Sequence, residues 1–191
     1  MDSWIFGYGS LIWRPDIKFI DRRPARLNGW ERRFWQGSHD HRGVPDSPGR
    51  VVTLIRTPAG HCDGVAYLVH REIVDETFST LDHREKNGYD RFDVNILFNG
   101  SGESAAGLVY IAGQDNHAFL GPAPVEQMAA QISTSIGPSG SNRDYLFDLA
   151  DALDELDADD PHVFELVHAV RTQDESTGKP NLSGLSRPAS G

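Results

Sequence analysis

The sequence predicts an α+β fold, in which a small curled or barrel-like sheet is followed by helices. Two observations support this prediction. Apolar runs of strand length fill the first two-thirds of the 191 residues, whereas apolar residues at helical spacing dominate after residue 120. The strands are short and numerous and do not alternate with helices, which argues against a parallel, doubly wound sheet.

The predicted strands are apolar or alternating runs bounded by turn residues. In chain order they cover residues 4–8, 26–30, 32–36, 50–56, 64–69, 92–98 and 108–112. The segment 37–50 is rich in Gly, Pro and Asp, and we predict that it forms a long polar loop.

The predicted helices follow from apolar residues three and four positions apart. The first helix covers residues 71–84, and the Asn87-Gly88 pair after it is a helix-ending signal. Three later helices lie within 125–136, 146–153 and 163–170. Nine carboxylates and no Lys or Arg lie between residues 144 and 165, and we interpret them as a solvated helix face and connecting loop. Residues 172–191 have almost no apolar content, so we predict a flexible tail after a single domain formed by 1–171.

The composition restricts the possible partners and the compartment. The formal net charge of −10 argues against binding to nucleic acid or to anionic membranes. A single cysteine, Cys62, excludes a disulfide framework within the chain and is interpreted as a buried, inert thiol. With no apolar run of membrane-spanning length and no secretion signal in view, we expect a cytoplasmic protein.

The charge is unevenly distributed along the chain. Residues 1–56 carry ten Arg or Lys and six Asp or Glu, a net charge of +4, so the remainder carries −14. This basic segment could form the wall of an anion-binding pocket. Alternatively its arginines are exposed on solvent-facing strand positions, as arginines usually are. The candidates for exposure are Arg22, Arg23, Arg32 and Arg33.

A glycine-rich turn, GYGSLI, follows the first predicted strand. It lacks the third glycine of a dinucleotide fingerprint, the Gly-Lys-Ser/Thr of a phosphate loop and the spacing of a nucleophile elbow. Glycine suits backbone conformations that other residues avoid, and successive backbone N–H groups in such a turn can form a concave anion site. A plain tight turn remains the alternative.

Glu85 lies near the predicted end of the 71–84 helix, in LDHREKNGY. The helix dipole there, and any burial, would disfavour the charged carboxylate, so Glu85 could take and return a proton near neutral pH. The alternative is a solvated helix end in which Asp82 and Lys86 form an ion pair beside it.

His39 and His41 lie two residues apart in the polar loop and could place two metal ligands on one side of a strand. Neither Cys nor an acidic residue completes a recognisable third ligand in the sequence. We therefore expect no metal.

Several collinear motifs resemble those of the ChaC-type, glutathione-specific γ-glutamylcyclotransferases, in the short form of that family. They are WIFGYGSLIW, RRFWQGSHDHRGVPDSPGRVVTL, GVAY, LDHREKNGY, LVYIA, DNHAFLGPAP and GPSGSNRDYLFDLA. The resemblance covers about residues 4–150. It implies a small mixed β-barrel with flanking helices and the conversion of glutathione to 5-oxoproline and cysteinylglycine, without a cofactor.

The resemblance also implies roles for particular residues. The γ-glutamyl group is expected against the first strand and its turn, which supply Ile5, Phe6, Gly7, Tyr8, Gly9 and Ser10. Glu85 is the implied general acid/base, and Tyr110 is expected to hydrogen-bond the substrate. Arg42 or Arg50 could bind the glycyl carboxylate of glutathione.

Two alternatives to this function remain open. The chain could be a γ-glutamylcyclotransferase that acts on other γ-glutamyl amino acids or amines, with the same chemistry and a different leaving-group pocket. It could also be a non-catalytic protein that senses a γ-glutamyl ligand.

Overall fold

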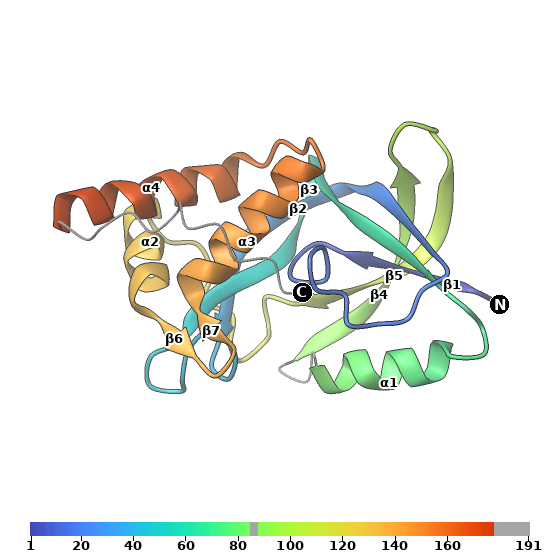
Figure 1. The fold of residues 1–191 in the computed structure, drawn as a ribbon, viewed down its shortest axis with the longest axis horizontal. Helices are drawn as coiled ribbons and strands as arrows, with labels where there is room; N and C mark the ends of the chain where they lie inside the picture. The colour runs from blue at the N-terminus through green and yellow to red at the C-terminus, as the bar shows by residue number, and fades with distance from the viewer. Residues whose placement is uncertain (85–87, 178–191) are drawn as a thin grey trace, which may run out of the picture.

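The computed structural model describes residues 1–84 and 88–177, and five strands in it close into a barrel (Figure 1). The strands are β1 (Ser3–Gly7), β2 (Asp21–Ser38), β3 (Gly49–Val69), β4 (Tyr89–Phe98) and β5 (Ser104–Ala112). Around the barrel the order is β1-β3-β2-β4-β5, and the parallel pairing of β1 with β5 closes it. The other pairs are antiparallel, so the predicted α+β class and mixed barrel are confirmed.

Strands β2 and β3 are much longer than predicted. The expected strands 26–30 and 32–36 are parts of the 18-residue β2, and 50–56 and 64–69 are parts of the 21-residue β3. The two strands form one antiparallel hairpin that continues through irregularities between Asn28 and Trp30 and between Arg33 and Gln36. Backbone pairing across a bulge leaves no apolar signature in the sequence, which is why the prediction divided each strand.

Helices lie on two sides of this sheet (Figure 1). They are α1 (Val74–Arg84), α2 (Val125–Thr134), α3 (Asn142–Glu155) and α4 (Pro161–Thr177), with a small hairpin, β6 (Ile136–Gly137) and β7 (Gly140–Ser141), between α2 and α3. Helices α2 to α4 pack together beside the long β2–β3 hairpin, and α1 lies against the barrel. In the described part of the chain, no helix is both long enough and apolar enough to cross a bilayer.

The core has two parts. The larger contains the barrel interior and the inner faces of α2 to α4, with Phe6, Phe34 and Leu149 among its buried side chains. The smaller lies under α1, where Leu81 packs with Ile5. Burial of these apolar side chains is the main stabilising contribution to such a fold.

The C-terminal helix extends past the predicted boundary of the domain. We predicted a flexible tail from residue 172, but α4 is helical to Thr177. Asp174 is buried and forms an ion pair with Arg143 of α3, with NH1 2.6 Å from Oδ1. Gln173 donates to the carbonyl of Glu126. These polar contacts hold the last turns of α4 against α3 and α2. A prediction based on apolar content could not detect them.

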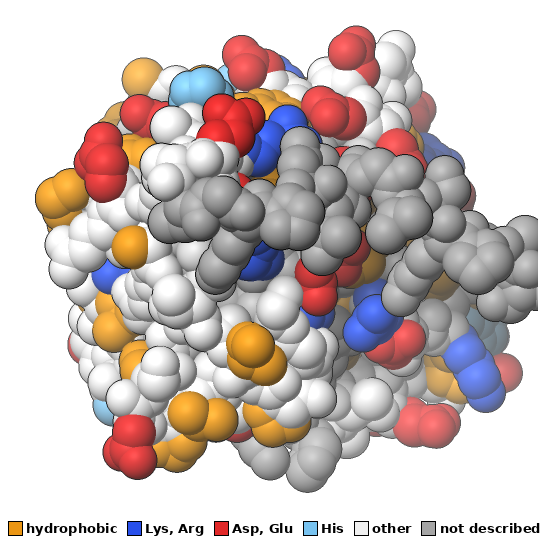
Figure 2. All heavy atoms as spheres, turned by 60° about the vertical axis from the view of Figure 1, so that its left-hand side comes forward, with side chains coloured by type: hydrophobic (Ala, Val, Ile, Leu, Met, Phe, Trp, Pro, Cys, Tyr) orange, Lys and Arg blue, Asp and Glu red, His pale blue; other side chains and the backbone are white. Residues whose placement is uncertain are grey.

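The acidic stretch 144–165 is mostly solvated, as predicted. Asp151, Asp154 and Glu155 are exposed. The face drawn in Figure 2 carries acidic side chains spread over it, with a few basic ones among them. Asp160 is the exception, because it forms an ion pair with Arg32 inside the domain.

Candidate active site

A cleft opens where the glycine turn after β1 faces α3 and the loop after β2. It has two adjoining hollows, of about 270 Å³ and about 50 Å³. Ser10, Tyr89 and Tyr145 line both hollows and therefore form the boundary between them.

The glycine turn is closed by its own carbonyl groups. The amide of Ile12 donates to Gly9 O at 2.9 Å, and the amide of Arg14 donates to Ser10 O at 2.8 Å. These bonds form a single helical turn, and the first N–H groups of such a turn have no acceptor within it. The arrangement therefore suits the predicted concave donor site.

Close packing, rather than an unusual backbone conformation, explains the two glycines. Neither Gly7 nor Gly9 has a positive φ. A Cβ at Gly9 would lie 3.0 Å from both Tyr145 Oη and Val52 Cγ2, and a Cβ at Gly7 would lie 2.7 Å from Leu11 Cβ. The expectation that the glycines serve a disfavoured conformation is thus wrong, and the close approach of the neighbouring side chains is the reason for them.

Arg32 holds the glycine turn in place from inside the domain. Its side chain is fully buried, so the solvent-facing alternative is wrong for this arginine. That alternative holds for Arg22 and Arg23, which are exposed, and Arg33 is half-buried. Arg32 Nε donates to Tyr8 O at 2.7 Å, NH1 contacts Asp160 Oδ2 at 2.6 Å, and NH2 donates to the carbonyl of Asp63. One guanidinium therefore joins the turn to β3 and to the start of α4.

A chain of hydrogen bonds runs behind the smaller hollow. The hydroxyl of Tyr8 donates to the carbonyl of Tyr110 at 2.8 Å, and the hydroxyl of Tyr110 donates to Asp82 Oδ1 at 2.8 Å. Asp82 also pairs with Arg91 at 2.6 Å. These bonds fix the orientation of the Tyr110 ring in the wall of the hollow.

The structure brings most of the predicted binding residues together. Those that line the smaller hollow are Phe6, Tyr8, Gly9, Ser10 and Tyr110. Ile5 and Gly7 line neither hollow: Ile5 is buried in the core under α1, and Gly7 lets Leu11 approach the strand. Glu85 and Lys86 lie outside the described residues, so the role of Glu85 stays a prediction.

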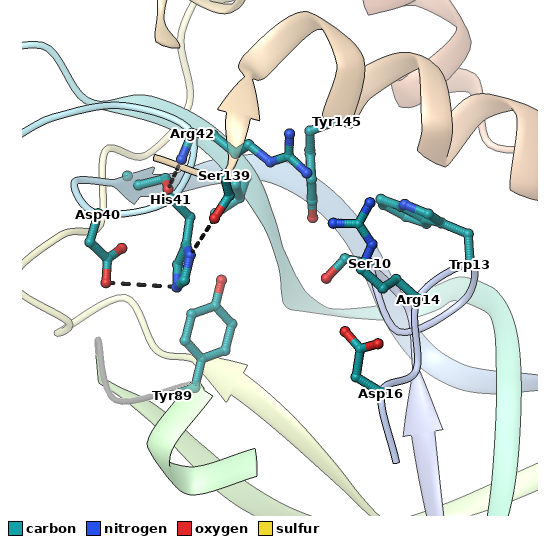
Figure 3. Close-up of a pocket in the computed structure, with 13 residues that line it drawn as sticks. Ser10, Trp13, Arg14, Asp16, Asp40, His41, Arg42, Tyr89, Ser139 and Tyr145 are labelled. Atoms are coloured by element: carbon teal, nitrogen blue, oxygen red, sulfur yellow. Dashed lines mark hydrogen bonds and ion pairs between the residues drawn. The ribbon is translucent and has the colours of Figure 1, made fainter. Parts of the chain in front are cut away.

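The two candidate arginines occupy different places. Arg42 lines the larger hollow, with its guanidinium 5.5 Å from the centre of the Tyr145 ring (Figure 3). Arg50 does not line it, and its guanidinium donates to Gln131 Oε1 at 2.7 Å and to the carbonyls of Phe34 and Gly121 at 2.9 and 3.2 Å. Burial lowers the pKa of both groups.

The histidine pair of the loop does not form a cluster of ligands. His41 Nδ1 lies 3.0 Å from Ser139 Oγ, and its Nε2 lies 3.7 Å from Asp40 Oδ2 (Figure 3). Within residues 1–84 and 88–177, no group of three or more His, Cys, Asp or Glu side chains is placed to hold a metal ion. Cys62 is buried as predicted, and burial raises the pKa of its thiol to about 12.

Sequence reasoning missed three residues that shape the cleft: Arg14, Tyr89 and Tyr145. Arg14 ends the glycine turn, and Tyr89 begins β4 directly after Gly88. Tyr145 faces the cleft from the first turn of α3. Their positions beside the motifs were the available signal, but only the fold shows that they meet.

Comparison with known proteins identifies the family. The family model described as ChaC-like protein matches residues 3–173. The chain belongs to the ChaC-like family. This ChaC-like protein is 46% identical over 179 residues to γ-glutamylcyclotransferase 2-3 of Arabidopsis thaliana, covering 90% of the chain and 89% of the relative.

Other relatives of the ChaC-like protein carry more specific names. It is 43% identical over 174 residues to human glutathione-specific γ-glutamylcyclotransferase 1, covering 88% of the chain and 78% of the relative. A crystal structure of the yeast γ-glutamyl cyclotransferase specific to glutathione superposes with a TM-score of 0.83 at 33% identity, covering 90% of this chain and 96% of that one. The resemblance seen in the sequence is thereby confirmed.

Proposed function

We propose that this ChaC-like protein cyclises the γ-glutamyl group of glutathione and releases 5-oxoproline and cysteinylglycine. The observation that carries the proposal is the smaller hollow, which the glycine turn and Tyr110 line. It occurs in a chain whose relatives at 43% and 36% identity are named glutathione-specific γ-glutamylcyclotransferases.

The reaction is a ring closure within one substrate molecule. The α-amine of the γ-glutamyl residue attacks its own γ-carbonyl carbon, a C–N bond forms, and the C–N bond to the cysteinyl nitrogen breaks. Both reacting groups lie in one molecule, so holding the substrate in a folded conformation provides much of the acceleration. Well-oriented intramolecular reactions reach effective molarities of about 10⁵–10⁸ M.

The glycine turn would hold the α-carboxylate of that residue. The N–H groups at the start of the turn are the proposed donors, because the first N–H groups of a helical turn have no acceptor within it. The carbonyls of Gly9 and Ser10, by contrast, accept bonds inside the turn. Gly9 supports this arrangement because its lack of a side chain lets Tyr145 and Val52 pack against the turn. N–H groups of the same turn are also candidates for stabilising the tetrahedral oxyanion.

Glu85 is the proposed proton carrier, on the grounds of its place in the family motif. The α-amine is an ammonium at neutral pH and cannot attack until it loses a proton. The attacking nitrogen loses two protons in all, one before attack and one as the lactam forms, and the cysteinyl nitrogen gains two as it leaves as an ammonium. A carboxylate that carries these protons one at a time balances the reaction without water. Tyr89, which follows Glu85 by four residues, lines both hollows.

Product analysis tests the proposal. Purified protein is incubated with glutathione, oxidised glutathione and γ-glutamyl-alanine, and 5-oxoproline and cysteinylglycine are measured by mass spectrometry. We expect both products from glutathione. A protein that binds glutathione and returns it unchanged would be a sensor, and preferred turnover of γ-glutamyl-alanine would indicate the broader cyclotransferase activity.

We also propose that the protein acts in the cytoplasm on this small molecule, without nucleic acid or membrane partners. The buried single cysteine suits a reducing compartment, and glutathione sets the redox poise of the cytosol. The net charge of −10 supports the absence of nucleic-acid binding.

A further inference from the structure

The larger hollow, beside the proposed γ-glutamyl site, is lined by two arginines and two aspartates. Arg42 and Arg14 both line it, and Figure 3 shows their guanidinium groups on either side of Tyr145. Arg14 comes from the glycine turn and Arg42 from the loop after β2, so two separate segments bring arginines to one cavity. Asp16 and Asp40 line the same hollow, and Asp40 Oδ2 lies 3.7 Å from His41 Nε2 rather than on Arg42.

Arg42, like Arg50, has no carboxylate partner within the part of the chain that the structure describes, whereas Arg32 and Arg143 do. Arg32 and Arg143 each pair with a carboxylate, at 2.6 Å from Asp160 and Asp174 respectively. Arg42 is 7% exposed, and no carboxylate of the described residues forms an ion pair with it. A buried cation without an anionic partner is unfavourable, because its desolvation is not offset.

The contacts that Arg42 does make hold it in place without neutralising it. Its amide donates to Ser38 Oγ at 2.9 Å, NH1 donates to the carbonyl of Ser141 at 3.2 Å, and the guanidinium stacks over the Tyr145 ring. The side chain is thus oriented by neutral groups in the wall of the cavity. A planar guanidinium held in this way is suited to a bidentate contact with a carboxylate.

We propose that Arg42, with Arg14 beside it, binds the carboxylate at the far end of the substrate's leaving group and so selects peptides that end one residue beyond the cysteine. The proposal rests on the function proposed above. Ser10 and Tyr145 form the boundary between the hollows, so a γ-glutamyl group in the smaller one directs the rest of the peptide into the larger one. Arg50, the other candidate, is excluded because three neutral acceptors already occupy its guanidinium outside this cavity.

The test compares glutathione with its glycyl amide, which replaces the terminal carboxylate by an almost isosteric neutral group. Wild-type protein should prefer glutathione by roughly ten- to a hundredfold in kcat/KM, which corresponds to losing one charge-assisted hydrogen-bonded contact. Most of this preference should be in KM, because the carboxylate lies away from the reacting atoms.

Substitutions then assign the preference to a residue. Arg42→Met should lower kcat/KM for glutathione by about the same factor and leave the amide almost unchanged, so that the preference disappears. Arg42→Lys, which keeps the charge, should restore part of it. Arg23→Met is the matched control, because Arg23 is an exposed arginine on the outer end of β2 and should leave both substrates unaffected.

The outcomes separate this inference from the proposed function. If the wild type releases 5-oxoproline from glutathione and its amide with equal efficiency, the function stands and the role of Arg42 is wrong; this comparison does not depend on any variant folding. The role is also wrong if Arg42→Met retains the preference. If the wild type releases 5-oxoproline from neither substrate, the proposed function itself fails.

Discussion

At the scale of single residues, the role of Glu85 can be tested by an almost isosteric change. Glu85→Gln should keep the thermal midpoint and lower kcat by about 10²–10⁴-fold, because an amide cannot accept the proton of the substrate ammonium. Turnover and thermal unfolding are measured on the same preparation. Glu72→Gln, at an exposed glutamate before α1, is the control. Near wild-type turnover in Glu85→Gln would exclude Glu85 as the base.

Gly9 provides a second test at this scale. Gly9→Val should weaken binding of a γ-glutamyl inhibitor at least tenfold and lower stability by about 1–3 kcal/mol, because even a Cβ would lie 3.0 Å from Tyr145 and Val52. Affinity and unfolding are measured by calorimetry. Gly113→Ala is a suitable control, since its nearest neighbour is the movable carboxylate of Asp115. Unchanged affinity in Gly9→Val would show that the turn is not a binding loop.

At the scale of elements, His162 joins α4 to β2 and makes that contact sensitive to pH. Its Nε2 accepts the amide of Phe34 at 3.0 Å, which requires the neutral ring. Burial, with the nearby charge of Arg33, lowers the pKa of His162 from 6.5 to about 4. Between pH 6.5 and pH 4, His162 is protonated in the unfolded chain but mostly neutral in the folded chain. The free energy of unfolding therefore falls as the pH is lowered through this range.

The size of this effect is at most about 3 kcal/mol, since each unit of pKa difference corresponds to about 1.36 kcal/mol. Urea unfolding at pH 7, 6 and 5 measures it. His162→Gln retains an acceptor but does not titrate, so its stability should depend less steeply on pH over this range. Equal slopes for the two proteins would show that His162 does not carry the pH dependence.

At the scale of the whole molecule, the sequence located the strand-forming and helix-forming segments but not their joint arrangement. It identified the glycine turn and Tyr110 because these lie within short motifs. It did not reveal that Arg32 is buried, because the partner that makes burial possible, Asp160, is 128 residues away. The choice between Arg42 and Arg50 likewise depends on tertiary contacts that neither segment shows by itself.

One further prediction concerns the metal dependence of the activity of the whole protein. Activity should be unchanged after treatment with EDTA and removal of the chelator, because the proposed proton transfer and ring closure need no Lewis acid. The rate of 5-oxoproline release is measured before and after treatment. Loss of activity that one divalent metal restores would contradict this prediction and would indicate a metal site, for which His39 and His41 are the candidate ligands.

The contacts of Arg32 also bear on when the site becomes complete during protein synthesis. This side chain joins groups that are 24, 31 and 128 positions away along the chain. A growing polypeptide that has left the ribosome only as far as β5 contains every strand of the barrel but not Asp160. The turn gains its full anchor only when the start of α4 has emerged, so unfinished chains lack part of the support of the turn that we propose binds the substrate.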